Sequence, residues 1–234
     1  MPIPYLHQEL FELSPSIKVK IREVDDVGPV LIIDNFYAYP NDIALMLEQS
    51  WVPAFHMNGV SRNFKDYYDC RLHNLPQSNT HPRYNESQSL LFDLINTKLK
   101  FEVVEKEYDY TFNLFKWINA PASNDIQFYP HKDSENHIAS VIYLNENEEL
   151  NHGTAFYKQV DALPNEEAVD IRVNIYEHTV PSDVIEAKFN RCIVYPSWYW
   201  HGAYVDDHEQ FVDNWRYNQV YFMKLRPTQS KVKI

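Results

Sequence analysis

The sequence predicts a mainly β protein, an antiparallel barrel or sandwich, with flanking helices in its N-terminal half. The C-terminal half contains many short segments that are rich in aromatic and β-branched residues and bounded by Asn, Asp, Gly or Pro. The N-terminal half contains two segments in which apolar residues recur at three- and four-residue intervals, the period of a helix. These two patterns give the predicted fold class.

The N-terminal elements follow from local signals. A short buried strand is predicted over residues 30–34, where aliphatic residues are contiguous. A helix is predicted from Pro40 to Trp51, because proline suits a first helical position and apolar residues follow it. Residues 53–82 show no clear period and predict a long loop, and a second helix is predicted over residues 86–101.

After residue 107 the pattern becomes that of strands. Strands are predicted over residues 108–118, 126–129, 138–144, 154–157, 169–175, 184–189, 191–195 and 215–223. Such short segments separated by turns favour a sandwich or barrel. We expect one domain over residues 1–234, in which 1–107 form an α/β support carrying substrate loops and 108–224 form the barrel core.

Composition excludes several classes of protein. The 234 residues are 44% hydrophobic and 15% aromatic, which is enough for one sizeable core. The formal net charge of −12 disfavours a nucleic-acid partner, since phosphates would be repelled. The two cysteines are too few for a disulfide scaffold and suit a reducing cytosol. With no secretory signal pattern and no apolar stretch near the about 18 residues of a membrane span, we expect a cytoplasmic protein without a membrane partner.

One group of residues indicates metal chemistry. His131 and Asp133 are two positions apart, and residues i and i+2 of a strand point to the same face. His201 follows another predicted strand and is a candidate third ligand. Two histidines and one carboxylate form the facial triad of non-haem Fe(II) oxygenases, which leaves coordination positions open. His131, Asp133 and His201 are therefore candidate catalytic and metal-binding residues.

A keto-acid cosubstrate would also need a cation for its far carboxylate, and arginine provides a bidentate clamp that is always charged. Arg216 starts a predicted strand, with Asn218 on the same face. Each feature alone has an ordinary structural alternative: a chance His-x-Asp pair, a histidine in a turn or core, and an arginine in a surface ion pair. Their joint order in strand context favours the metal site.

Six segments of the chain resemble the Fe(II)/2-oxoglutarate-dependent dioxygenase superfamily, especially its prolyl-hydroxylase-like branch. These segments are residues 130–133, 142–145, 152–157, 190–197, 201–202 and 215–219. The resemblance covers about half of the chain in specific motifs. It departs at His152-Gly-Thr, where the family usually has Gly-Gly-Thr, and the expected role of this segment is a tight turn into a strand.

The resemblance implies a double-stranded β-helix, a jelly-roll or cupin-like barrel, with Fe(II) held by His131, Asp133 and His201. It implies that Arg216 clamps the distal carboxylate of 2-oxoglutarate and that Tyr143 hydrogen-bonds to it. Asn218 stands where part of the superfamily has serine, so it is a candidate second contact. The implied activity uses O2 to hydroxylate a C–H bond of an amino acid, a peptide side chain or another small molecule, with release of succinate and CO2.

Substrate selection is expected in the loop before the barrel, since such loops commonly select substrates in folds whose scaffold is shared. Arg62, Tyr67 and Trp198 are the candidate substrate residues, and the alternative is that such residues only pack at the barrel mouth. Two other functions remain open: a metal-binding barrel with Zn or Mn and other chemistry, and a non-catalytic binding barrel. A small-molecule or peptide partner is expected, and a homodimer is also considered.

Overall fold

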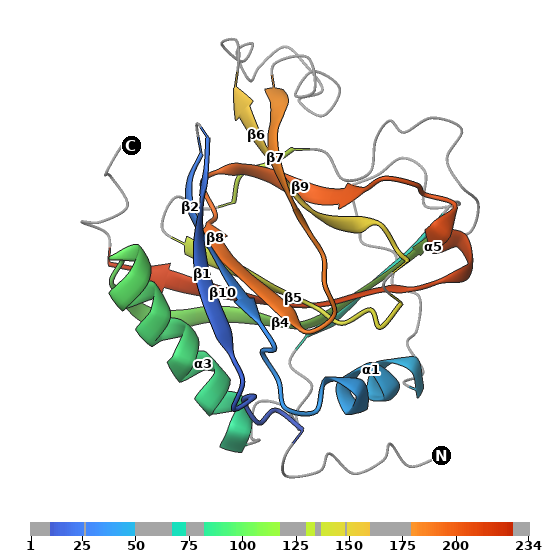
Figure 1. Ribbon diagram of the computed structural model, residues 1–234, viewed down its shortest axis with the longest axis horizontal. Coiled ribbons are helices and arrows are strands. Elements are labelled where there is room, and N and C mark those ends of the chain that lie inside the picture. The colour runs from blue at the N-terminus through green and yellow to red at the C-terminus, as the bar shows by residue number, and fades with distance from the viewer. Residues whose placement is uncertain are drawn as a thin grey trace.

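Two β-sheets face each other in the structure, a computed structural model, with helices below the larger sheet (Figure 1). The structure describes residues 10–25, 27–49, 67–73, 82–117, 130–133, 137–147, 149–159 and 179–226. Among these residues, no helix is long and apolar enough to cross a membrane.

The larger sheet has seven antiparallel strands in the order β1-β2-β8-β5-β10-β4-β3. Its strands are β1 (Lys18–Val24), β2 (Gly28–Asp34), β3 (Tyr67–His73), β4 (Val103–Trp117), β5 (His137–Tyr143), β8 (Arg191–Pro196) and β10 (Arg216–Leu225). Because β1, β2 and β3 all join this sheet, the N-terminal half supplies strands as well as helices. The predicted division at residue 107 stays a prediction.

The smaller sheet has three strands in the order β7-β6-β9. They are β6 (His152–Gln159), β7 (Thr179–Glu186) and β9 (Trp200–Val205), and an isolated bridge between His131 and His201 adds residues 130–133 beside β9. From β4 onward the chain therefore passes repeatedly between the two sheets. This is the topology of a double-stranded β-helix, and it confirms the predicted fold class.

Two apolar cores hold these layers together. The outer core lies between the larger sheet and the helices α1 (Pro40–Gln49), α3 (Pro82–Leu94) and the single π-turn η1 (Ile95–Leu99). The inner core lies between the sheets and includes Tyr143, Phe156 and Tyr195. The short helix α5 (Gln210–Asp213) closes one end, where Phe211 is fully buried. Side chains on the inner face of both sheets thus line the interior of the barrel.

Most of the predicted elements that fall within the described residues are confirmed. The strand at residues 30–34 corresponds to β2, the helix from Pro40 to α1, and the helix over 86–101 to α3 with η1. The strands predicted over 108–118, 138–144, 154–157, 191–195 and 215–223 correspond to β4, β5, β6, β8 and β10. The strands predicted over 126–129 and 169–175 lie outside the described residues.

Four strands differ from the prediction or were not predicted. The long loop over 53–82 is wrong at residues 67–73, which form β3 at the edge of the larger sheet by pairing with β4. The strand predicted over 184–189 is displaced, since β7 ends at Glu186 and Asn190 has a left-handed φ of 63° that turns the chain into β8. Strands β1 and β9 were not predicted, because neither has the aliphatic density of the buried strands.

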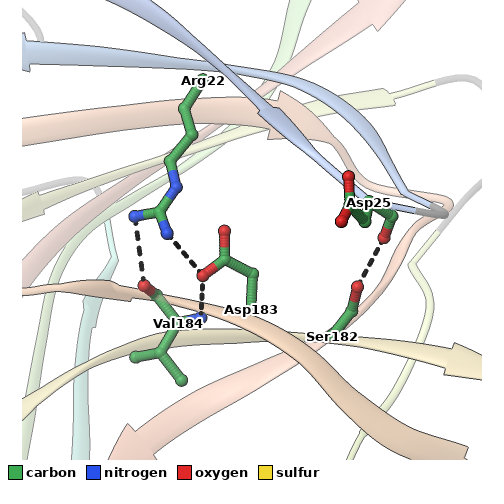
Figure 2. A network of polar contacts seen from close by, with 5 residues as sticks. All are labelled: Arg22, Asp25, Ser182, Asp183 and Val184. Carbon is green, nitrogen blue, oxygen red and sulfur yellow. Dashed lines mark hydrogen bonds and ion pairs between the residues drawn. The ribbon is translucent and has the colours of Figure 1, made fainter.

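The β1–β2 hairpin also ties the edges of the two sheets together (Figure 2). Arg22 of β1 donates from Nη2 to Asp183 Oδ1 of β7 at 2.6 Å, and Ser182 Oγ donates to the carbonyl oxygen of Asp25. Asp183 Oδ1 accepts in addition from the backbone N–H of Val184, which fixes the carboxylate. Since Arg22 and Asp183 are both partly exposed, the ion pair itself adds little stability and serves mainly to position the hairpin.

We expect Gly28→Ala to destabilise the protein by about 1–3 kcal/mol. Gly28 has a φ of 126°, and a Cβ built there would lie 2.2 Å from the hydroxyl oxygen of the buried Tyr199. Denaturant unfolding of the variant measures the change. Lys20→Ala, on the exposed face of the same hairpin, is the matched control and should change the free energy of unfolding by much less; equal effects of both substitutions would contradict the steric explanation.

Candidate metal and anion site

The three predicted ligands are brought together by backbone hydrogen bonds. His131 N–H donates to the His201 carbonyl oxygen at 2.9 Å, and His201 N–H donates to the His131 carbonyl oxygen at 3.0 Å. Two residues later, Asp133 N–H donates to the carbonyl oxygen of Ser197. These bonds hold residues 131–133 as an extended segment against β9 and the turn before it. Directly opposed residues of an antiparallel pair share a face, so the two imidazoles lie on the same side.

The side chains converge as this backbone arrangement requires. One potential ligand atom from each of His131, Asp133 and His201 lies within 4.8 Å of the other two. His201 Nε2 is 3.4 Å from one carboxylate oxygen of Asp133, and His131 Nε2 is 3.9 Å from the other. The His131 side chain is 45% exposed and that of His201 only 6%, so the cluster lies at the boundary between the barrel interior and solvent.

The donor set fits a divalent first-row transition metal. His201 Nδ1 lies 2.7 Å from the carbonyl oxygen of Tyr199, which can only accept, so Nδ1 carries the proton and Nε2 keeps its lone pair for a metal. Burial raises the pKa of Asp133, but the hydrogen bond and charge of His201, with His131 and His137, outweigh burial and hold this pKa below its ordinary value. An ionised carboxylate and two imidazole nitrogens match the facial triad of Fe(II) sites.

A buried cation lies deeper in the barrel. Arg216 is 4% exposed, and its Nη2 donates to the carbonyl oxygen of Gly153 at 3.2 Å. Asn218, two residues along β10, is paired directly with the inner-core residue Tyr143 of β5, so both β10 side chains face the interior. Burial lowers the pKa of Arg216, while Tyr143 and Tyr195 raise it. Since arginine remains charged in proteins, the interior contains a guanidinium suited to a carboxylate.

Tyr195 packs against the metal-ligand cluster and is influenced electrostatically by Arg216. Its ring centroid is 4.8 Å from that of His201. Burial raises the pKa of Tyr195 most, Asp133 and Tyr143 raise it further, and Arg216 lowers it. Tyr195 is therefore within electrostatic range of both the Asp133 carboxylate and the Arg216 guanidinium.

Neutral polar groups surround Arg216. The Tyr143 hydroxyl is 2.7 Å from Thr154 Oγ1 of β6, and burial raises the pKa of Tyr143 to about 12. Asn218 is 2% exposed, and its Oδ1 has no hydrogen-bond partner among the described residues. A bound anion would therefore meet one permanent cation together with hydroxyl and amide groups, the combination that recognises a carboxylate.

The predicted substrate residues are placed less completely. Arg62 lies outside the described residues, and Tyr67 is described only as part of the backbone of β3. Trp198 is partly buried, and its ring contacts those of Phe101 and Tyr199 edge-on at 5.4 and 5.8 Å. The substrate role of these three residues stays a prediction.

Sequence reasoning did not identify three residues of the interior as part of the site: Tyr195, Thr154 and His152. All three lie on strands whose alternation places them inward, since Thr154 and His152 share the face of Phe156. That alternation was the signal available in the sequence. His152 is not the turn residue that was expected, because it begins β6 and is 3% exposed.

No family model and no curated protein matches the chain. Among solved structures, it is similar to a prolyl 4-hydroxylase from Phytophthora capsici, with 16% identity, a TM-score of 0.43, and coverage of 88% of this chain and 63% of that one. It is also similar to a prolyl hydroxylase from Trichoplax adhaerens, solved with a peptide of hypoxia inducible factor. The identity is 13% and the TM-score 0.46, with coverage of 88% of this chain and 87% of that one. A third similar structure is HygX from Streptomyces hygroscopicus, solved with nickel, 2-oxoglutarate and hygromycin B. The identity is 10% and the TM-score 0.47, with coverage of 83% of this chain and 82% of that one. Similarity in fold does not identify an activity, because activity depends on the residues of the site.

We expect the protein to bind one divalent ion such as Mn(II) or Co(II) at the triad. At a free metal concentration of about 100 times Kd, binding should stabilise the folded state by about 2.7 kcal/mol. Thermal unfolding with and without metal measures this gain. Asp133→Ala should abolish it, whereas Asp93→Ala, a change of an exposed carboxylate on α3, should preserve it. An equal gain in the Asp133 variant would show that the metal binds elsewhere.

We also expect His152 to make the fold sensitive to acid. Burial, and secondarily Arg216, lowers the pKa of His152 from 6.5 to about 3, so the unfolded chain binds a proton that the folded chain excludes between these pH values. Stability should therefore fall as the pH drops below about 6.5. Unfolding free energies of wild type and His152→Phe, measured from pH 9 to pH 4, should diverge in slope only below neutrality. Parallel curves over the whole range would contradict a neutral buried imidazole.

Proposed function

We propose that this chain is an Fe(II)- and 2-oxoglutarate-dependent oxygenase that hydroxylates a C–H bond of an amino acid, a peptide side chain or another small molecule. The observation that supports this most is the convergence of His131, Asp133 and His201 in one barrel with the buried Arg216. A metal triad alone fits several chemistries. A deep guanidinium in the same interior adds the recognition element that a keto diacid requires.

Each residue has a role that follows from its surroundings. His131, Asp133 and His201 would hold the ion, with His201 oriented by the Tyr199 carbonyl and Asp133 kept ionised by the neighbouring imidazoles. Bound iron, together with O2 and the keto acid, supplies oxidative decarboxylation to succinate and CO2, coupled to C–H hydroxylation. The rest of the catalytic contribution of the chain is binding and orientation of the reactants.

Arg216 would hold the far carboxylate of the keto diacid. Tyr143 can donate to the same carboxylate, because its raised pKa keeps the phenol protonated. Its hydroxyl lies in the interior, next to Thr154 Oγ1 of β6. The amide of Asn218, opposite Tyr143 in the sheet, would provide a further contact. These three residues would orient the cosubstrate so that its keto-acid end points toward the metal triad.

Several further predictions accompany the activity. The substrate class is a peptide or small molecule, the location is cytoplasmic, a homodimer is considered, and no nucleic-acid partner is expected. The net charge of −12 supports the last of these, and the buried free thiol of Cys192 is compatible with a reducing compartment. The division of the chain into a support and a barrel core is kept as part of this proposal.

Turnover of 2-oxoglutarate tests the activity. Iron-loaded protein should form succinate from 2-oxoglutarate in the presence of O2, and a pool of amino acids and peptides should yield a product heavier by one oxygen atom. His131→Ala and Asp133→Ala should lose succinate formation, since each removes a ligand. Arg216→Ala should raise the KM for 2-oxoglutarate by roughly tenfold or more, because a charge-assisted bond is lost.

Arg226→Ala is the matched control, because Arg226 forms an exposed ion pair with Glu102 at the end of the same strand. It should leave the KM unchanged. Full activity of the Arg216 variant, or failure of 2-oxoglutarate to bind, would favour a metal-dependent barrel of other chemistry. Absence of metal binding at saturating Fe(II) would favour a non-catalytic binding protein.

A further inference from the structure

His152 is a buried imidazole that the proposed mechanism does not use. It is 3% exposed and begins β6 on the inner face, opposite Val205 of β9. Its ring packs edge-on against those of Tyr143 and Phe211, with centroid distances of 5.8 and 5.4 Å. These contacts on two sides fix the position of the ring inside the barrel.

The imidazole also lies close to the buried guanidinium. The next residue, Gly153, accepts a hydrogen bond from Arg216 through its carbonyl oxygen. Arg216 contributes to lowering the pKa of His152, after burial, so the imidazole is neutral at physiological pH. A neutral imidazole has one N–H donor, and it can approach a carboxylate without repelling the neighbouring arginine.

The hydrogen-bonding capacity of this ring is not used within the described chain. His152 Nδ1 is buried and has no hydrogen-bond partner there, and the same is true of Asn218 Oδ1. Burying such a group without a partner is costly. His152 lies on the inner face of β6, and Asn218 lies on that of β10, the strand of Arg216. A carboxylate at Arg216 can accept from His152 Nδ1–H, whereas Asn218 Oδ1 is itself an acceptor and needs a donor.

The His152 ring also borders an open space. A cavity of about 270 Å³ lies at this end of the barrel and is lined by Tyr143 and His152, together with Asn145, Leu150 and Lys188. Arg216, Thr154 and Asn218 do not line it. Tyr143 and His152, whose pKa values Arg216 influences, therefore also face this cavity.

We propose that His152 determines which keto diacid the site accepts: its Nδ1–H donates to the far carboxylate held by Arg216, and its ring closes the end of the pocket against longer acids. This inference rests on the proposed function and adds a specificity-determining residue to it. Removal of the ring would join the pocket to the cavity behind it. A five-carbon keto diacid would then lose one contact, and a six-carbon one would gain space.

Direct binding tests the inference without turnover. Calorimetry on Mn(II)-loaded protein, under nitrogen, would give Kd for 2-oxoglutarate and for 2-oxoadipate, which is one methylene longer. Wild type should bind 2-oxoglutarate at least about tenfold more tightly. His152→Leu should weaken 2-oxoglutarate binding by about tenfold or more, since a hydrogen bond to a charged group is lost. His152→Ala should shift the ratio of the two affinities toward 2-oxoadipate by about tenfold.

His152→Asn keeps an N–H donor in a smaller side chain and should recover part of the affinity for 2-oxoglutarate. His208→Leu is the matched control, a buried histidine outside the pocket, and should change neither Kd. If wild type fails to bind 2-oxoglutarate, the proposed function fails with the inference. If wild type binds it but His152→Leu and His152→Asn do so equally well, or if wild type binds both acids equally, only the role of His152 is overturned.

Discussion

The reciprocal backbone hydrogen bonds between His131 and His201 are the constraint on which the site depends. They pair two segments that are far apart in the sequence, and they place two imidazoles side by side with ring centroids 4.5 Å apart. The alternation of an extended chain then brings Asp133 to the same face. The bond from Asp133 N–H to the Ser197 carbonyl holds this segment against the turn before β9, so the ligand geometry is a consequence of strand pairing.

The charges of the interior are arranged along the barrel. The ionised Asp133 lies at the triad, and the Arg216 guanidinium is buried in the same interior. Burial raises the pKa of the phenols Tyr143 and Tyr195, which keeps them neutral. A divalent cation held at the triad and the Arg216 guanidinium would each attract a carboxylate, and such attraction is strong in an interior of low dielectric constant. A keto diacid with one end at a metal and the other at arginine matches this arrangement, and a molecule with a single anionic end matches only half of it.

The sequence identified the parts of the site that obey local rules. The spacing of His131 and Asp133, and that of Arg216 and Asn218, needs only the two-residue period of a strand. The edge strand β1 was not predicted because Lys18, Val19 and Lys20 are exposed, so pairing with β2 rather than burial makes it a strand. The burial of His152 was not predicted either. A histidine becomes a buried neutral group only through the residues packed around it, and local sequence does not specify these.

Buried polar atoms without hydrogen-bond partners in the described chain lower the stability of the fold around the site. Besides His152 Nδ1 and Asn218 Oδ1, the described chain has such atoms at Gln88, Ser140 and Tyr199, which lie on other strands or elements. Two of them flank one guanidinium on the inner faces of facing sheets. Each costs about 1–3 kcal/mol in the absence of a ligand. A carboxylate that accepts from His152 Nδ1–H recovers the free energy lost at that atom, so this imidazole weakens the empty barrel but strengthens the binding of an anion beside Arg216.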